Sequence, residues 1–328
     1  MRSLHRRIKH YNQQNSDMAK VLINDGIHPS GLQKLKDAGI EVSTDKIAQE
    51  DLAAQLPAYD AICVRSATKV RQELIDQCPN LKVIGRGGVG LDNIDVEHAK
   101  SKGIEVVNTP AASSRSVAEL VFAHLLSVSR FLYQANRSMP EDGDNNFKGL
   151  KKSYAKGSEL EGKTLGIIGF GRIGQHTAKV ALGMGMEVIA SDPYVDTATI
   201  DMGRFGTVDI ATGSMDDLLS RADVITLHVP FTGEAVLSSD QFNKMKDGVV
   251  IINASRGGTI DETALLEALD NGKVAAAGLD VFENEPNPRQ DLLQHPRISL
   301  SPHIGASTNE AQEKIGLELA DKLISILT

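Results

Sequence analysis

Short apolar runs alternate with helical patterns of apolar residues from about Lys20 to the end of the chain. The run Val249–Ile252 contains no polar residue, which is typical of a strand buried on both faces of a parallel sheet. Runs of this kind predict strands, and stretches with helical spacing separate most of them. The predicted strands are Lys20–Asn24, Ala61–Val64, Leu81–Gly85, Ile104–Asn108, Thr164–Ile168, Glu187–Ser191, Val224–Leu227, Val249–Asn253, Val274–Leu279 and Ile298–Leu300. Such alternation predicts an α/β fold, in which helices cover both faces of parallel sheets.

One long helix is predicted from about Ser116 to Tyr133, where apolar residues recur at helical spacing. Ser113 and Ser114 are suited to cap its start. The helix follows a break at Pro110, so we expect it to carry the chain from one domain to the next. The polar, glycine-containing stretch Pro140–Gly157 is predicted to be a loop.

Length and charge restrict the class of protein. A single hydrophobic core stops growing near ~250–300 residues, so a chain of 328 residues predicts two domains. The formal net charge of -8 argues against general binding to nucleic acid or to anionic membranes. The sequence also lacks an apolar run near the ~18 residues that a membrane span needs.

The cysteines and the N-terminus indicate an intracellular protein. Cys63 and Cys78 lie among apolar neighbours, which favours small buried hydrophobes over redox groups, and we expect no metal site. The segment Met1–Arg7 is basic but lacks the apolar stretch of a secretory signal. A mitochondrial-type presequence and a polar tail are both open readings; the polar run Asn12–Asn15 favours the tail. We expect the ordered chain to begin near Met18 and the protein to be cytoplasmic.

A glycine pattern marks a candidate cofactor site. The segment Gly169-Phe170-Gly171-Arg172-Ile173-Gly174 follows the strand Thr164–Ile168 and begins a predicted helix. Gly169 permits a tight turn, Gly171 lets the backbone approach a pyrophosphate, and Gly174 lets helix and strand pack closely. The helix N-terminus offers N–H groups to the phosphates. Such glycines also occur in ordinary turns and in FAD sites, but this strand–loop–helix context favours NAD.

Asp192 supports the same interpretation, because it ends the next predicted strand 18 residues after Gly174. An acidic residue near this spacing accepts hydrogen bonds from the ribose hydroxyls of NAD. Its charge would also repel the 2′-phosphate of NADP.

Three polar residues follow the later strands, where ligands bind in doubly wound sheets. Arg256 follows Val249–Asn253, Glu285 follows Val274–Leu279, and His303 follows Ile298–Leu300. A guanidinium holds a substrate carboxylate, a histidine exchanges the proton of an alcohol, and a carboxylate orients the imidazole. Each residue alone is also compatible with a solvated or capping group. Together they suit hydride transfer to or from a 2-oxo acid. His228 also ends a strand and is the alternative base.

From about Met18 to its end, the chain resembles the D-isomer-specific 2-hydroxyacid dehydrogenase family in the glycine segment and in the segments around Arg256, Glu285 and His303. The resemblance implies that these last three residues are catalytic. It also implies that Asp280 lies near the nicotinamide amide, and that the segment from His228 to Pro230 lines the cofactor.

The resemblance also implies the architecture, which is α/β with two doubly wound parallel-sheet domains. A Rossmann NAD-binding domain, residues 113–302, would be inserted into a flavodoxin-like substrate domain formed by residues 1–112 and 303–328. Substrate would bind between the domains, and their closure would exclude water. Family likeness further suggests a homodimer built through the cofactor domains.

Within the family, the segments Val64–Val70, Gly85–Asp95 and His303–Thr308 are most similar to the members that act on 3-phosphoglycerate. Arg65 and Arg86 each follow a predicted strand, which would suit the second anion of a phosphorylated substrate; ordinary surface ion pairing is the alternative. The remaining expected substrate contacts are Ser66, the backbone of Gly87, Gly88 and Val89, and Lys152, which is the weaker phosphate candidate.

The implied reaction is oxidation of 3-phospho-D-glycerate to 3-phosphonooxypyruvate, the first step of L-serine biosynthesis. The alternatives are a glyoxylate or hydroxypyruvate reductase, a D-lactate dehydrogenase, and an NAD-sensing binding protein like the corepressors that share this fold. Many members with the phosphorylated substrate carry a C-terminal domain that senses serine. This chain ends at Thr328, so we expect no serine feedback through such a domain.

Overall fold

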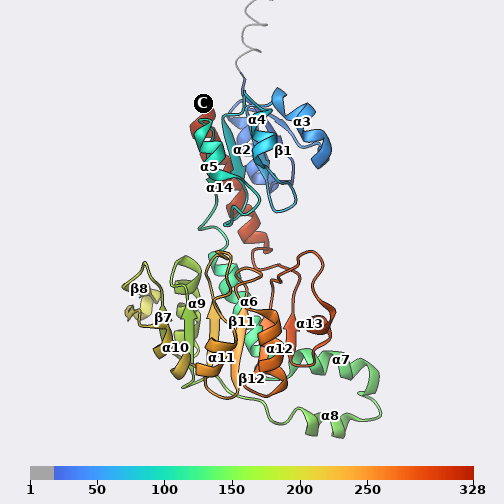
Figure 1. Cartoon of the computed structure of the whole chain (residues 1–328), viewed down its shortest axis with the longest axis vertical. Helices are drawn as coiled ribbons and strands as arrows, with labels where there is room; N and C mark the ends of the chain where they lie inside the picture. The colour runs from blue at the N-terminus through green and yellow to red at the C-terminus, as the bar shows by residue number, and fades with distance from the viewer. Residues whose placement is uncertain (1–17) are drawn as a thin grey trace, which may run out of the picture. The chain divides into compact units, whose positions relative to one another are not determined.

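Helices and strands alternate throughout the computed structural model, which describes residues 18–328 (Figure 1). The expectations for Met1–Arg7 and Asn12–Asn15 therefore lie outside the described residues. The described chain divides into two compact units. Unit 1 contains residues 18–113 and 307–328, and unit 2 contains residues 114–306.

Within its described residues, unit 1 is built on a five-stranded parallel sheet of order β2-β1-β3-β4-β5. The strands are β1 (Lys20–Ile23), β2 (Glu41–Ser43), β3 (Ala61–Val64), β4 (Val83–Arg86) and β5 (Glu105–Asn108). The helices are α2 (Pro29–Asp37), η1 (Gln49–Asp51), α3 (Leu52–Gln55), η2 (Leu56–Ala58), α4 (Gln72–Asp76), α5 (Val96–Ser101) and α14 (Asn309–Leu327). This strand order is flavodoxin-like, as predicted.

Both faces of the unit 1 sheet are buried. Val21 and Ile23 of β1 belong to the same apolar cluster as Leu35 of α2 and Leu319 of α14, whereas Leu22 belongs to the cluster on the other face. This explains why β1 reads as a continuous apolar run.

The C-terminal helix is fastened to unit 1 by a close helix contact. A Cβ atom added at Gly31 of α2 would lie 2.4 Å from the carbonyl oxygen of Gly316 in α14. The two backbones therefore approach more closely than any side chain permits, and α14 completes a unit whose other elements lie at the start of the chain.

Within residues 114–306, unit 2 contains a six-stranded parallel sheet of order β13-β12-β11-β10-β6-β7. Its strands are β6 (Thr164–Ile168), β7 (Glu187–Ser191), β10 (Val224–Leu227), β11 (Val249–Asn253), β12 (Val274–Leu279) and β13 (Ile298–Leu300). Its helices are α6 (Ser114–Ser129), α7 (Leu132–Asp142), α8 (Phe147–Ser153), α9 (Arg172–Gly183), η3 (Gly203–Phe205), α10 (Met215–Arg221), α11 (Ser239–Lys244), α12 (Glu262–Asp270) and α13 (Gln290–Gln294). β7 lies on one side of β6 and β10 on the other, so the strand order reverses there, as in a Rossmann fold. The predicted fold class, with one doubly wound domain inserted into another, is confirmed.

The boundaries between the units differ slightly from the expected ones. The chain passes between units at 113/114 and 306/307, whereas the sequence analysis expected 112/113 and 302/303. Residues 303–306 belong to unit 2 because Asp280 holds them there. Its carbonyl oxygen accepts from His303 N at 2.8 Å, and its carboxylate accepts from Ile304 N at 2.8 Å and Gly305 N at 2.9 Å.

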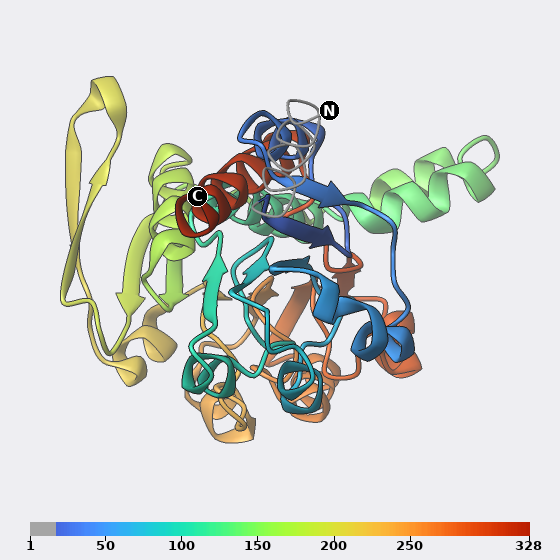
Figure 2. The same cartoon turned by 90° about the horizontal axis from the view of Figure 1, so that it is seen from above.

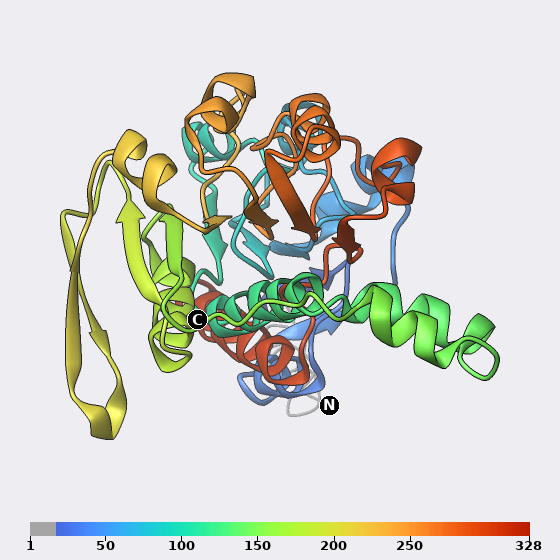
Figure 3. The same ribbon diagram turned by 90° about the horizontal axis from the view of Figure 1, so that it is seen from below.

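Two projections of unit 2 were not predicted, and they extend from opposite sides of it (Figures 2 and 3). One is an antiparallel hairpin of β8 (Thr197–Asp201) and β9 (Thr207–Ala211). The other consists of α7 and α8. The stretch Pro140–Gly157, which was predicted to be a loop, contains the end of α7 and all of α8. These helices are tied together by the stacked rings of Phe131 and Tyr154 and by a 2.7 Å hydrogen bond between the hydroxyls of Ser138 and Tyr154.

The predicted long helix is divided in two. α6 ends at Ser129, Phe131 takes a left-handed backbone with φ 55°, and α7 begins at Leu132. Of the two expected caps, Ser113 does not act as one, because its Oγ is buried and has no hydrogen-bond partner among the described residues. No single helix in residues 18–328 is long and apolar enough to cross a membrane, although α6 and α7 pass that test as a pair bent by 57°.

Candidate active site

The three glycines after β6 satisfy three separate steric requirements. Gly169 has φ 90°, and a Cβ atom there would lie 2.7 Å from the carbonyl oxygen of His228. A Cβ at Gly174 would lie 2.3 Å from the carbonyl oxygen of Gly169. At Gly171, by contrast, no atom of the described chain lies within 4 Å of the Cβ position, apart from those of Gly171 and its two chain neighbours. The first turn of α9, with Arg172 and Ile173, is thus open to an approaching anion on the side of Gly171.

Asp192 lies beside this loop. Its Oδ2 accepts a hydrogen bond of 2.6 Å from the backbone N–H of Phe170, and its Oδ1 accepts one of 2.8 Å from Tyr194 N. The two backbone contacts hold the carboxylate at the carboxyl end of β7, next to the loop that follows β6. The sequence spacing between Asp192 and the glycines therefore corresponds to real proximity.

His303 and Glu285 form a directly paired side-chain set. His303 Nδ1 lies 2.7 Å from Glu285 Oε2, and Glu285 Oε1 accepts from Phe282 N at 3.0 Å. Burial raises the pKa of Glu285, but the hydrogen bond and charge of His303, with smaller contributions from Phe282 N–H and Arg256, lower it by more, so the net shift is downward. The His303 side chain is 47% exposed, so the imidazole is accessible although it is oriented.

Arg256 is brought to this pair by close packing of two loops. A Cβ at Gly257 would lie 1.8 Å from the carbonyl oxygen of Phe282, so the loop after β11 contacts the loop after β12. Asn253 Nδ2 donates to Arg256 O at 3.2 Å, and Arg256 Nη1 donates to Ser255 O at 2.7 Å. The structure therefore gathers Arg256, Glu285 and His303 at one edge of the unit 2 sheet, together with Asp280.

His228 is poorly suited to act as a base. Its Nε2 lies 3.2 Å from Thr177 Oγ1 and 3.3 Å from Thr226 Oγ1, while its buried Nδ1 has no hydrogen-bond partner in residues 18–328. Burial lowers the pKa of His228 to about 3. The ring is therefore neutral at physiological pH, because a protonated imidazole would place a charge in a site that is shielded from water. His228 and Val229 instead lie against the turn at Gly169, and the next residue, Pro230, is exposed.

In unit 1, hydrogen bonds to Asp25 hold the loop after β3 in place. Its carboxylate accepts from Arg65 N at 2.7 Å, Thr68 N at 3.0 Å and Thr68 Oγ1 at 2.7 Å. Asn93 Nδ2 donates to the carbonyl oxygens of Arg65 and Thr68 at 2.7 and 2.6 Å. Since the backbone is held on both sides, the side chain of Arg65 and the exposed Ser66 project from a rigid support.

The loop after the neighbouring strand β4 carries the second arginine. Gly88 has φ 143°, and a Cβ there would lie 1.8 Å from Arg86 Nη1, so the guanidinium folds over the glycine. Gly88 N donates to Thr109 Oγ1 at 2.8 Å, and Asn108 Nδ2 donates to Val89 O at 2.6 Å. Because β3 and β4 are parallel neighbours, Arg65 and the segment Arg86–Val89, which includes Gly87, lie at the same edge of the unit 1 sheet.

Residues 122–305 match the family described as D-isomer specific 2-hydroxyacid dehydrogenase, NAD binding domain. The chain belongs to this family. It is 44% identical to a hydroxypyruvate reductase of Thermotoga maritima over 94% of this chain and 98% of that protein. It is 43% identical to a D-3-phosphoglycerate dehydrogenase of Archaeoglobus fulgidus over 94% of this chain, but it spans only 57% of that protein's length.

The fold agrees with the family assignment. A glyoxylate reductase from Paecilomyes thermophila superposes with a TM-score of 0.81 and 31% sequence identity, covering 94% of this chain and 95% of that chain. The protein is therefore an NAD-dependent D-2-hydroxyacid dehydrogenase, and the Rossmann unit is its NAD-binding domain.

Lys152 of the dehydrogenase is not gathered with the predicted catalytic residues of its unit. It is exposed on α8, which lies beyond the C-terminal end of α6 (Figure 1). The residues around His303 lie near the opposite end of α6, since a Cβ at Gly305 would be 3.3 Å from Val117 Cγ2. A 16-residue helix is about 24 Å long. The length of α6 therefore separates Lys152 from His303 within one molecule.

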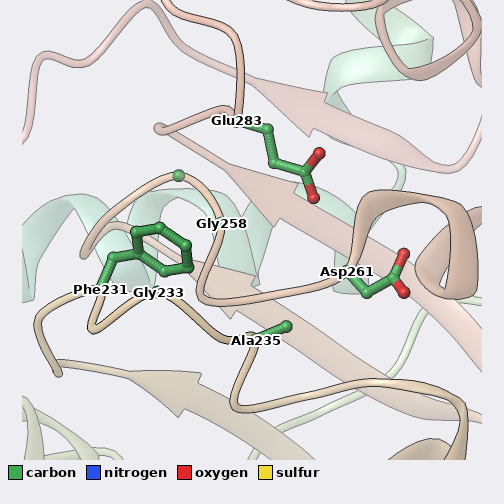
Figure 4. A pocket seen from close by; sticks show the side chains of 7 residues that line it. Phe231, Gly233, Ala235, Gly258, Asp261 and Glu283 are labelled. Atoms are coloured by element: carbon green, nitrogen blue, oxygen red, sulfur yellow. The ribbon is translucent and has the colours of Figure 1, made fainter.

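Two cavities of the dehydrogenase lie next to these loops, and the sequence analysis did not identify either. One, of about 420 Å³, is bounded by Phe231, Gly258, Asp261 and Glu283 (Figure 4). The other, of about 380 Å³, is lined mainly by apolar residues and reaches Glu285 and His303. Their lining residues come from separate loops, so local sequence pattern gives no signal for them.

Proposed function

We propose that the dehydrogenase oxidises 3-phospho-D-glycerate to 3-phosphonooxypyruvate, the first step of L-serine biosynthesis. The observation that carries this proposal is the pair of arginines at the carboxyl edge of the unit 1 sheet, Arg65 after β3 and Arg86 after β4. A substrate with one carboxylate needs one guanidinium, to which we assign Arg256, and a phosphate is a second anion, to which we assign Arg65 and Arg86. The likeness to a D-3-phosphoglycerate dehydrogenase supports the same substrate.

The predicted catalytic residues divide the reaction between them. Glu285 accepts a hydrogen bond from His303 Nδ1, so Nε2 is left to take the proton of the C2 hydroxyl. Arg256 holds the substrate carboxylate, and the backbone N–H groups of Gly87–Val89 are assigned to the same anion. When bound, NAD supplies the acceptor for the hydride that leaves C2.

The glycine loop fits this cofactor. Gly171 leaves space for a pyrophosphate beside the first turn of α9, and Asp192 offers its carboxylate to the ribose hydroxyls. We assign Asp280 to the nicotinamide end of the cofactor, because its backbone carbonyl oxygen accepts a hydrogen bond from His303 N.

Reduction of hydroxypyruvate is the second candidate. It is favoured by the 44% identical relative of Thermotoga maritima, which is a hydroxypyruvate reductase. Hydroxypyruvate differs from 3-phosphonooxypyruvate only in carrying a hydroxyl where the latter carries a phosphate, so both candidates use the same chemistry at C2. The choice between them depends on what Arg65 and Arg86 bind.

The deciding experiment follows NADH absorbance while the protein reduces 3-phosphonooxypyruvate, hydroxypyruvate, glyoxylate and pyruvate in parallel. We expect preference for the phosphorylated acid, and a loss of about 10- to 100-fold in its kcat/KM on Arg65→Ala, the range for a charge-assisted contact. Arg221→Ala, which changes an exposed arginine of α10, is the matched control. Equal loss for all four acids, or preference for hydroxypyruvate in the wild type, would remove the phosphate assignment.

We also propose that the protein is a cytoplasmic homodimer joined through unit 2. Large apolar side chains are exposed on three successive helices of this unit, namely Leu126, Leu132, Met139 and Phe147. Exposed apolar side chains of this kind favour association. Cys63 and Cys78 are buried free thiols, which suits a reducing compartment.

A further inference from the structure

A buried histidine outside the proposed reaction lies in the middle of α6. His124 is 4% exposed, and its ring stands between two serine hydroxyls. His124 Nδ1 lies 2.9 Å from Ser299 Oγ, and Nε2 lies 2.8 Å from Ser301 Oγ. The two hydrogen bonds fix the orientation of the buried imidazole. One of its partners, Ser301, is two residues before His303.

The directions of these hydrogen bonds follow from the Asp280 carboxylate, which can only accept and which ends the series of hydrogen bonds that begins at His124. Ser301 Oγ donates to Asp280 Oδ1 at 2.6 Å, which uses the only hydroxyl proton of Ser301. His124 Nε2 must then donate to Ser301 Oγ. Burial lowers the pKa of His124, and the Asp280 charge opposes this without reversing it, so the ring is neutral. A neutral imidazole has one proton, so Nδ1 accepts from the hydroxyl of Ser299.

Asp280 connects this series of hydrogen bonds to the backbone around His303. Its Oδ1 also accepts from Ile304 N, and its Oδ2 accepts from Gly305 N. Its backbone carbonyl oxygen accepts from His303 N. His303 has φ 54°, a left-handed backbone that is unfavourable for a residue with a Cβ and persists only where surrounding contacts impose it. Asp280 makes these contacts on both sides of His303.

The ring of His124 has little freedom to leave this arrangement. A Cβ added at Gly278 of β12 would lie 2.6 Å from the Cβ of His124, so α6 and β12 are in close contact at this position. Gly305 is confined as well, since its Cβ position is 3.2 Å from Asp280 Oδ2. The hydrogen-bonded chain therefore links rigid elements and ends at a segment, residues 301–305, that has no helix or strand of its own.

We propose that His124, acting through Ser301 and Asp280, is a positioning residue that holds the backbone of His303 in its left-handed conformation. This inference rests on the proposed function of His303 as the base. His124 touches neither substrate nor reacting atoms in this scheme. It keeps Ser301 oriented as a donor, so that one Asp280 carboxylate can hold Ser301, Ile304 and Gly305 together.

The test compares His124→Leu, which removes the ring donor, with His124→Gln, whose amide nitrogen can still donate to Ser301. Leu125→Ala is the control for lost packing on the same helix, because Leu125 is fully buried but lies outside the hydrogen-bonded chain. Ser301→Ala removes the hydroxyl that connects His124 to Asp280, and it provides the same comparison if His124→Leu fails to fold. Each variant is examined by amide hydrogen exchange of the 300–306 segment, and by kcat, KM and the pH profile of NADH-dependent reduction of the 2-oxo acid that the wild type prefers.

For His124→Leu we expect exchange at residues 304 and 305 to accelerate about tenfold, kcat to fall about 10- to 100-fold with little change in KM, and the pH profile to shift. His124→Gln should restore most of each value, and Leu125→Ala should reduce thermal stability without moving the pH profile. The proposal is overturned if His124→Leu exchanges and titrates like Leu125→Ala, or if glutamine does not rescue it. Hydrogen exchange needs no turnover, so it still decides the positioning role if the wild type reduces none of the acids and the proposed function fails.

Discussion

The Nδ1 atom of His303 lies 2.7 Å from Oε2 of Glu285, and the other carboxylate oxygen, Oε1, accepts the backbone N–H of Phe282. This second contact matters because it prevents the carboxylate from rotating away from the imidazole. A carboxylate accepts hydrogen bonds only, so Nδ1 must carry a proton and Nε2 is the nitrogen available for proton transfer. The lowered pKa of Glu285 keeps the carboxylate charged throughout the neutral range.

Replacing Glu285 by glutamine should therefore change the pH dependence of the reaction. Glu285→Gln keeps the size of the side chain but removes the charge that pairs with His303 Nδ1. Reduction of a 2-oxo acid needs a proton from this pair, so we expect the pH profile of the reduction rate to change. At neutral pH the rate should fall about tenfold or more. Steady-state rates between pH 5 and 9 measure both effects.

The matched control for this substitution is Glu318→Gln on α14, where the carboxylate pairs with Lys322. This control should retain the wild-type pH profile. A profile that is the same in Glu285→Gln and in the wild type would show that Glu285 does not act on the reacting proton.

Asp192 should decide the choice between NADH and NADPH. Its carboxylate is fixed beside the glycine loop by Phe170 N and Tyr194 N, where it would repel a 2′-phosphate. For Asp192→Ala we expect kcat/KM for NADH to fall about tenfold or more, while activity with NADPH rises relative to NADH. The ratio of the two kcat/KM values is the quantity to measure.

The control for Asp192 is Asp247→Ala, which removes a carboxylate that is 90% exposed and pairs with Lys273. It should leave the coenzyme ratio unchanged. An unchanged ratio in Asp192→Ala as well would mean that another residue binds the adenosine ribose.

Residues whose environment is set by neighbours in sequence could be predicted, and residues whose environment is set by distant elements could not. The strands Thr164–Ile168 and Val249–Asn253 occur with their predicted bounds, because each is rich in apolar residues and is bounded by polar residues or glycine. His124 and Ser299, by contrast, are 175 positions apart and meet only when α6 packs across the sheet. No local pattern distinguishes that histidine from an ordinary core residue.

The incorrect elements have similar physical causes. Pro140 begins the stretch that was predicted to be a loop, yet α7 includes it two residues before its end at Asp142. The helix loses only the one hydrogen bond that the nitrogen of residue 140 would donate. In β8, only Ala198 and Ile200 are buried, so the alternation is too short to stand out from the surrounding polar residues. Both projections are stabilised by contacts that a linear pattern does not show.

The proposed homodimer predicts that a single exposed side chain on α8 controls assembly. Phe147 is 59% exposed, and we expect Phe147→Ser to convert the dimer into a monomer or to raise its dissociation constant about tenfold or more, because burying such a ring contributes roughly 1.5–3 kcal/mol. Light scattering across a concentration series measures this. Phe205→Ser is the control, since Phe205 is 79% exposed at the tip of the β8–β9 hairpin on the other side of unit 2. Loss of the dimer in Phe205→Ser alone would place the interface at the hairpin.

Glu262, at the start of α12, should make unit 2 less stable as the pH rises. Its side chain is buried, its Oε1 accepts from Glu283 N at 2.8 Å, and its Oε2 has no hydrogen-bond partner within the described chain. Burial raises the pKa of Glu262; the hydrogen bond from Glu283 N–H opposes this shift and the charge of Glu283 adds to it. A carboxyl whose pKa is higher in the folded state stabilises the fold below its unfolded pKa, near 4.5, and this stabilisation is lost as the pH rises through the folded pKa.

Glu262→Gln should therefore be more stable than the wild type at neutral pH and lose that advantage toward pH 4.5. Glutamine retains an oxygen for Glu283 N but carries no charge to desolvate. We expect a rise in Tm of roughly 2–4 °C at pH 7.5, the shift that about 1 kcal/mol produces in a domain of this size. Calorimetry of both proteins between pH 4.5 and 7.5 measures the difference. A constant difference across that range would show that Glu262 does not titrate there, and a destabilised variant at pH 7.5 would show that its buried oxygens both contribute hydrogen bonds that the amide cannot replace.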